Sequence, residues 1–294
     1  MINYQPFPTE AISIVPPRAA QADPRTSLHR LRARFVRNDG LPFADVLTEA
    51  RVHDVLNEHG VRYRDRVFNP VTTLWGSLSQ VLSDDHSCND AVTRIIAHRA
   101  ASGQATCSPN NASYCNARGR LPTAVLGTLT KRTARELQAA AAEEWKWNGR
   151  SVFIADGSHV SMPDTPENQA AYPQPPTQEP GVGFPLARVV VLLSLATGAC
   201  HDLAIAPYEG KGTGETTLLR AMYGSLRPGD VVLADALFDN YFLICELRRR
   251  GIDVVVRARY ERVGSQVLQD RPDGEILLWR RPNKPRGMTG ELGR

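Results

Sequence analysis

The fold of this chain is decided by a short apolar segment that ends in an acid, Ser151-Val-Phe-Ile-Ala-Asp156. A second segment of the same form, Asp230-Val-Val-Leu-Ala-Asp235, lies further along the chain. Short apolar runs between polar residues are typical of buried strands. Side chains just beyond the ends of neighbouring strands point into the crevice where an open sheet binds ligands. The two segments therefore predict that Asp156 and Asp235 follow their strands and meet at one edge of a sheet.

The sequence around these segments predicts a mixed α/β domain. Strands are expected over 188–195 and 200–206, joined by a hairpin turn at Thr197-Gly198. Helices are expected over 216–223 and 241–250, with a last strand over 252–258. The order is strand, hairpin pair, helix, strand, helix, strand. It matches the order of a ribonuclease H-like mixed β-sheet with helices on its faces.

Upstream of Gly149 the apolar spacing is helical. Helices are expected over 72–82, from an N-cap at Asn89, and from Pro122 to about Trp145. The fold class is therefore α/β, with a helical domain before the sheet domain. The predicted divisions are an extended arm over 1–26, a helical domain over 27–148, a ribonuclease H-like domain over 149–285 and an irregular tail over 286–294.

The composition excludes several classes of protein. Hydrophobic residues make up 42% of the 294 residues, charged residues make up 22%, and no apolar run has the length of a membrane span. The polar N-terminus does not resemble a secretory signal peptide, and the five cysteines form no C-x-x-C pair. We expect a cytoplasmic protein with no membrane partner.

The net charge of +4 is unevenly distributed along the chain. Residues 1–150 carry a net charge of +5, residues 151–244 carry −6 and residues 245–294 carry +5. An acidic middle between basic flanks suits a metal centre set among surfaces that hold an anionic polymer. Random surface charge is the alternative explanation of the same pattern.

Two carboxylates that meet at a sheet edge repel each other, and a hard divalent cation relieves the repulsion. Mg²⁺ (or Mn²⁺) prefers such oxygen ligands, and a pair of ions can promote phosphodiester cleavage. Asp156 and Asp235 are thus the candidate catalytic and metal-binding residues. The alternative, in which each aspartate only caps a turn or helix, is left open.

Several blocks of the sequence resemble the DDE transposases of the insertion-element-four family. The blocks are spread over residues 40 to 285 and include Asp156-Gly-Ser-His-Val-Ser-Met-Pro-Asp164, Pro180-Gly-Val-Gly-Phe-Pro185, Pro207-Tyr-Glu-Gly-Lys-Gly-Thr-Gly-Glu215 and, upstream, Phe68-Asn-Pro-Val-Thr-Thr-Leu-Trp75. The resemblance implies a ribonuclease H-like domain that uses two Asp and one Glu to hold magnesium. It also implies transposon-end cleavage and strand transfer, with double-stranded transposon-end and target DNA as partners. A homodimer is left open.

The sequence departs from the family in two places. Ala236 stands where the family usually has Arg after the second Asp, and the family's Tyr, Arg, Glu and Lys motif is not found. Glu275 and Glu291 lie in the wrong context to replace its glutamate. The resemblance therefore implies an incomplete catalytic domain in a truncated copy with little or no strand transfer. Whether the chain is an active enzyme is left open.

Two other functions remain as alternatives. One is a non-catalytic DNA-binding regulator of transposition. The other is a magnesium-dependent nuclease whose third carboxylate is Asp239 or Glu215.

Basic residues outside the acidic pair are candidates for contact with the DNA backbone. Lys211 lies in a glycine-rich loop, where a plain flexible connector is an equal alternative. The others follow at the end of a helix and on the next strand: Arg248, Arg249, Arg250, Arg257 and Arg259.

Overall fold

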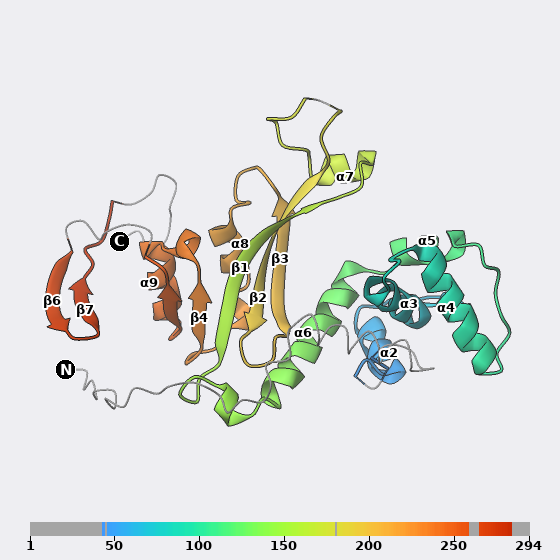
Figure 1. The fold of residues 1–294 in the computed structure, drawn as a ribbon, viewed down its shortest axis with the longest axis horizontal. Coiled ribbons are helices and arrows are strands. Elements are labelled where there is room, and N and C mark those ends of the chain that lie inside the picture. Colours follow the sequence, from blue (N-terminus) through green and yellow to red (C-terminus); the bar gives the residue numbers. More distant parts are fainter. Residues whose placement is uncertain (1–42, 45, 180, 259–264, 284–294) are drawn as a thin grey trace. The chain divides into compact units, whose positions relative to one another are not determined.

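The computed structural model describes residues 43–44, 46–179, 181–258 and 265–283 (Figure 1). The chain divides into two compact units, Met1–Val125 and Leu126–Arg294. The predicted arm over 1–26 and the tail over 286–294 lie outside the described residues. The predicted domain division at residue 148 stays a prediction.

The first unit is built from helices, as expected. They are α2 (Glu49–Glu58), α3 (Pro70–Leu82), α4 (Cys88–Ala101) and α5 (Ala112–Gly119). Gly76 of α3 allows the close packing of α3 against its neighbours, because a Cβ there would lie 2.9 Å from Ile95 Cδ1 and 3.0 Å from Tyr114 Cε2. Ile95 and Tyr114 are buried in one apolar cluster. This packing gives the short helices of the unit a shared core.

Side-chain caps set where these helices begin. Asn69 Oδ1 accepts a hydrogen bond from the Thr72 amide at 2.9 Å and starts α3. The predicted N-cap at Asn89 is wrong, because Ser87 caps α4 instead. Its Oγ accepts from the Asp90 amide at 3.1 Å, which places Asn89 inside the helix.

The helix predicted from Pro122 is α6 (Thr123–Ala139), and a separate 3₁₀ turn, η1 (Glu143–Trp145), follows it. Polar contacts hold α6 to the sheet domain. Gln138 donates to Ser151 Oγ at 3.0 Å, and Lys131 forms an ion pair of 2.8 Å with Asp202. Asp202 is only 3% exposed, so the ammonium group of Lys131 compensates a carboxylate that has lost most of its water.

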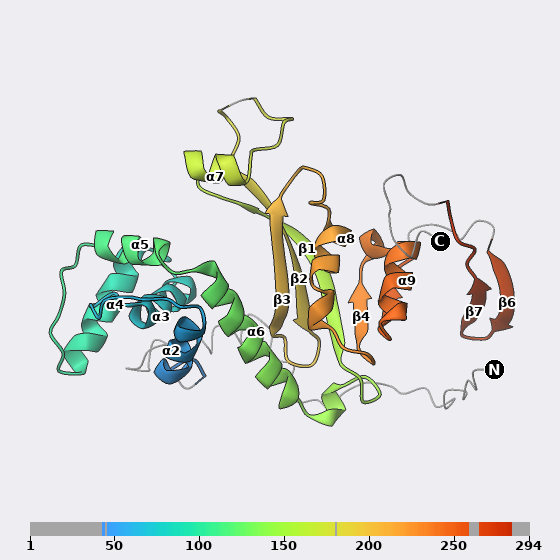
Figure 2. The ribbon, with the colours of Figure 1, turned by 180° about the vertical axis from the view of Figure 1, so that it is seen from behind.

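The sheet of the second unit has five strands in the order β3-β2-β1-β4-β5 (Figures 1 and 2). The strands are β1 (Val152–Ser161), β2 (Leu186–Ser194), β3 (Cys200–Pro207), β4 (Val231–Ala234) and β5 (Asp253–Val256). β1, β2 and β3 pair antiparallel, whereas β4 and β5 add in parallel beside β1. The predicted mixed sheet of ribonuclease H-like order is therefore confirmed.

Helices connect and cover these strands. They are α7 (Pro166–Ala171), α8 (Glu215–Ala221), the 3₁₀ turns η2 (Tyr223–Ser225) and η3 (Ala236–Phe238), and α9 (Tyr241–Arg249). One core cluster joins Leu219 of α8 and Leu243 of α9 to Phe153 and Ala155 of β1. Because Phe153 and Ala155 alternate along the strand, they point to the same face of the sheet. The helices thus bury the apolar face of the strands that carry the acids.

A separate antiparallel hairpin follows, formed by β6 (Gln266–Arg271) and β7 (Gly274–Leu278). Its strands expose Val267, Leu268 and Leu278. Among the helices that the structure describes, none combines the length and apolar character needed to span a bilayer.

Leu219 offers a direct test of this core, because it is fully buried beneath the sheet. We expect Leu219→Ala to lower the free energy of unfolding by about 2–5 kcal/mol, from the loss of buried apolar contact and the cavity that remains. Leu237→Ala is the matched control, since Leu237 is 52% exposed; its effect should stay within about 0.5 kcal/mol. Urea unfolding followed by circular dichroism measures both, and equal losses would contradict the placement of the core.

Candidate functional site

The two candidate acids occupy equivalent places on adjacent strands. β1 and β4 run parallel, with Ala155 opposite Ala234 in the register. The residue after each of these alanines is an aspartate, Asp156 or Asp235. Adjacent strands lie about 4.8 Å apart, so the structure brings the two predicted acids to neighbouring positions.

The prediction that Asp156 follows the end of its strand is wrong. β1 continues to Ser161, and Asp156 lies within it, opposite Val191 of β2. The long antiparallel pairing with β2 provides hydrogen-bond partners for the backbone beyond Asp156, which the apolar run alone did not reveal. On its other side β1 loses its partner, because β4 ends at Ala234. Asp156 therefore lies where pairing with β4 stops.

Each carboxylate is exposed and is oriented by one backbone amide. The Gly157 amide donates to Asp156 Oδ1 at 2.9 Å, and the Leu237 amide donates to Asp235 Oδ1 at 2.9 Å. Asp235 also caps η3, as the alternative interpretation expected. Within the described residues, Oδ2 of each aspartate forms no hydrogen bond. One oxygen of each acid thus stays available to a cation or to water.

A third carboxylate lies against Gly157, the residue after Asp156. Glu215 is the first residue of α8, and a Cβ built on Gly157 would lie 2.5 Å from its carboxyl carbon and 2.7 and 2.8 Å from its two oxygens. The carboxylate of Glu215 therefore lies against Gly157, where glycine has no side chain to displace it. Glycine is required here by this close approach rather than by an unusual backbone angle.

The chemistry of these donors fits a magnesium ion. They are carboxylate oxygens at a partly exposed sheet edge, where a hard cation can keep several waters. Across the described part of the chain, however, no three His, Cys, Asp or Glu residues converge closely enough to hold a metal ion by themselves. Asp239, the other acid considered, ends η3, whereas Glu275 lies in the separate hairpin and Glu291 lies outside the described residues.

Arg188 is a residue near this edge that the sequence interpretation missed. It stands opposite His159 in the register of β1 and β2, and its guanidinium lies 5.2 Å from the centre of the Tyr208 ring. The imidazole of His159 meets the same ring edge-on at 4.8 Å. Arg188 Nε is buried without a hydrogen-bond partner in the described structure. The sequence feature that could have identified Arg188 is a positive charge within an otherwise apolar strand.

Lys211 is exposed in the loop between β3 and α8. Gly212 in this loop has φ +83°, a conformation that favours glycine. The Arg188 guanidinium donates to Thr213 O at 3.2 Å, which ties the loop to β2. Lys211 itself extends from a loop held near Glu215.

The predicted basic cluster is mostly exposed, but two of its members have partners. Arg248 forms an ion pair with Asp253, and the guanidinium of Arg250 lies 4.9 Å from the centre of the Tyr223 ring. Arg249 and Arg257 are exposed. Arg259 lies outside the described residues. Contact of these residues with DNA stays a prediction.

The contact of Glu215 with Gly157 can be measured by a double-mutant cycle. We expect Gly157→Ala to displace the Glu215 carboxylate and to destabilise the chain less when Glu215 is already alanine. The coupling in the free energy of unfolding should be about 1 kcal/mol. Gly127→Ala is the control, because nothing lies within 4 Å of a Cβ at that position. Additive effects within about 0.3 kcal/mol would show that the two residues do not touch.

The chain is similar in sequence to known transposases. The putative transposase InsZ of Escherichia coli (strain K12) is 25% identical over 167 residues, which cover 55% of this chain and 55% of that protein. The chain thus spans about half the length of the relative that it matches. A solved structure of a piggyBac transposase synaptic complex with hairpin DNA covers 74% of this chain and 50% of its own, with 12% identity and a TM-score of 0.36. Residues 147–289, which include every strand described above, match the family model of the transposase DDE domain.

Proposed function

We propose that this chain is a DNA transposase, and that Asp156 and Asp235 are its catalytic acids. The observation that carries the proposal is their equivalent position after Ala155 and Ala234, within the segment that matches a transposase DDE domain. We further propose that the chain belongs to the insertion-element-four family and that its partners are transposon-end and target DNA.

The two aspartates would hold Mg²⁺ or Mn²⁺ at the sheet edge. The bound metal would supply Lewis-acid stabilisation of the charge that develops on the phosphodiester. The Gly157 and Leu237 amides each orient one aspartate through a hydrogen bond to its Oδ1. Lys211, on the loop before Glu215, supplies positive charge for a DNA phosphate.

The reaction is an in-line displacement at phosphorus. Water attacks the phosphodiester at the transposon end, and the bond from phosphorus to the 3′ oxygen breaks. The freed 3′-hydroxyl then attacks a phosphodiester of target DNA, which releases that strand's own 3′ oxygen. The expectation that this chain performs the second step poorly stays a prediction.

A magnesium-dependent nuclease is a second candidate function, favoured by the contact of Glu215 with Gly157. In that function Glu215 would provide the third carboxylate, and cleavage would not be followed by strand transfer. A regulator without catalysis would bind DNA ends and cleave nothing.

Substitution of the two aspartates tests the proposed site. Asp156→Asn and Asp235→Asn should each reduce magnesium-dependent cleavage of end DNA by more than the roughly 10- to 100-fold typical of losing an outer-shell partner. Mn²⁺ affinity, measured by electron paramagnetic resonance, should fall in parallel, and excess chelator should abolish cleavage. Gel analysis of labelled end DNA, with and without target DNA, measures cleavage and strand transfer separately.

Asp164→Asn is the matched control, because Asp164 is an exposed acid just beyond β1. It should leave both cleavage and Mn²⁺ affinity unchanged. Cleavage that survives in Asp156→Asn would overturn the proposed site, and Glu215→Gln would separate the nuclease from the transposase by its effect on each product.

A further inference from the structure

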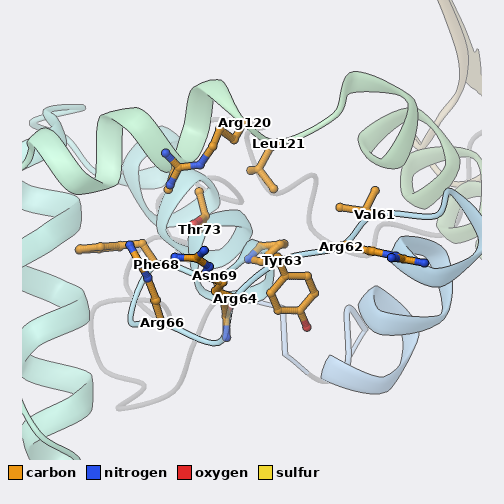
Figure 3. Close-up of a pocket in the computed structure, with 12 residues that line it drawn as sticks. Val61, Arg62, Tyr63, Arg64, Arg66, Phe68, Asn69, Thr73, Arg120 and Leu121 are labelled. Carbon is orange, nitrogen blue, oxygen red and sulfur yellow. The ribbon is translucent and has the colours of Figure 1, made fainter.

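The first unit contains a cavity that the acidic site does not use. It has a volume of about 270 Å³ and lies between the segment 61–68, the first turn of α3 and the end of α5 (Figure 3). No acidic residue lines it, whereas four arginines do: Arg62, Arg64, Arg66 and Arg120. We call it the arginine cavity.

Three arginines of this cavity have no acidic partner in the described part of the chain. Arg64, Arg66 and Arg120 are exposed, and their guanidinium groups form no hydrogen bond or ion pair with the residues that the structure describes. The nearest acid in the sequence, Asp65, instead accepts a hydrogen bond from Asn69 Nδ2 at 3.2 Å. Several unpaired guanidinium groups around one hollow create a positive potential that attracts an anion.

A buried hydroxyl at the base of the cavity lacks a partner. Thr73 is fully buried, and its Oγ1 has no hydrogen-bond partner in the described structure. Figure 3 shows its side chain between Arg120 and Asn69. Such orphaned hydroxyls are uncommon, because each one costs the free energy of a lost hydrogen bond. An anion oxygen in the cavity would accept the hydrogen bond that the protein does not provide.

The position of the cavity also favours an anion. The cavity lies at the N-terminus of α3, a helix of 13 residues, and the positive end of a helix dipole attracts negative charge.

A second cavity adjoins the first and makes the site long enough for a chain of anions. Its volume is about 590 Å³, and it shares Arg66, Phe68 and Arg120 with the arginine cavity. The rest of its lining is mainly small and polar, including Ser108 and Asn116. Hydroxyl and amide side chains of this kind commonly contact DNA phosphates. A free phosphate ion would leave most of this space unfilled.

We propose that the arginine cavity binds a backbone phosphate of DNA, and that the adjoining cavity binds the next part of the same strand. The proposal rests on the proposed function, because it takes DNA as the substrate. Arginine suits this role since its planar guanidinium can hold two phosphate oxygens at once. The first unit thereby contributes a DNA-backbone contact that is independent of the acidic residues of the sheet.

Removing two shared arginines tests the proposal on the full chain. Arg66→Gln/Arg120→Gln should weaken binding to a fluorescein-labelled duplex by about tenfold or more at low salt. The slope of log affinity against log salt should fall by about two, because each lost phosphate contact removes about 0.9. Fluorescence anisotropy in the presence of chelator measures binding without cleavage.

Arg99→Gln is the matched control, since it removes one positive charge from the same unit but lines neither cavity. Its slope should equal that of the unchanged chain. An unchanged slope in the double variant would overturn the proposal. The proposal would also be overturned if the double variant lost tight binding of inorganic phosphate but kept its affinity for DNA. If the unchanged chain cleaves DNA and the double variant binds DNA equally well, only the proposal about the arginine cavity is contradicted. If the unchanged chain binds DNA through these arginines but does not cleave it, only the proposed function is contradicted.

Thr73→Val separates a ligand role from a structural one. The substitution keeps the shape of the side chain and removes a hydroxyl that has no partner among the described residues. We expect DNA binding to weaken by about three- to tenfold, the loss of one hydrogen bond to a charged group, with no fall in the melting temperature. A lower melting temperature with unchanged DNA affinity would show that Thr73 serves the fold instead.

Discussion

The parallel pairing of β1 with β4 is the constraint on which the candidate site depends. It sets Ala155 opposite Ala234 and so places Asp156 and Asp235 at neighbouring positions, although 79 residues separate them in the sequence. A shift of one residue in this register would turn one carboxylate toward the opposite face of the sheet. The buried face of β1, with Phe153 and Ala155 under α8 and α9, opposes such a shift because it would expose apolar side chains to water.

Other parts of the second unit hold the strands near Asp156 and Asp235 in place. Beyond Asp156, β1 remains paired with β2, which carries Arg188 toward the loop that precedes α8. At the start of α8, Glu215 packs against Gly157, so the position of the helix and the absence of a side chain at 157 depend on each other. The buried Asp202, compensated by Lys131, anchors α6 to the strands. The acids are thus held by backbone pairing and by packing, not by contacts among themselves.

Charge is arranged differently in the two units. In the second unit Asp156 lies on β1 and Asp235 directly follows β4, so the register of the two strands controls their positions. In the first unit the arginines lie on an irregular segment and at the end of α5, around the buried hydroxyl of Thr73. The second unit thus has an acidic sheet edge, and the first unit has a basic hollow. The uneven distribution of charge along the sequence already pointed to such a division, but not to the residues that form the hollow.

The sequence by itself determined the class of fold and the order of the strands along the chain, because short apolar runs are local features. It did not determine where β1 ends, since the residues after Ala155 are polar and only the pairing with β2 keeps them in a strand. Asn89 was a plausible cap by residue type, yet Ser87 was the one whose hydroxyl reached a free amide. Glu215 and Thr73 acquired their significance only in the tertiary structure, because their neighbours, Gly157 and Arg120, are far away in the chain and are brought near by packing.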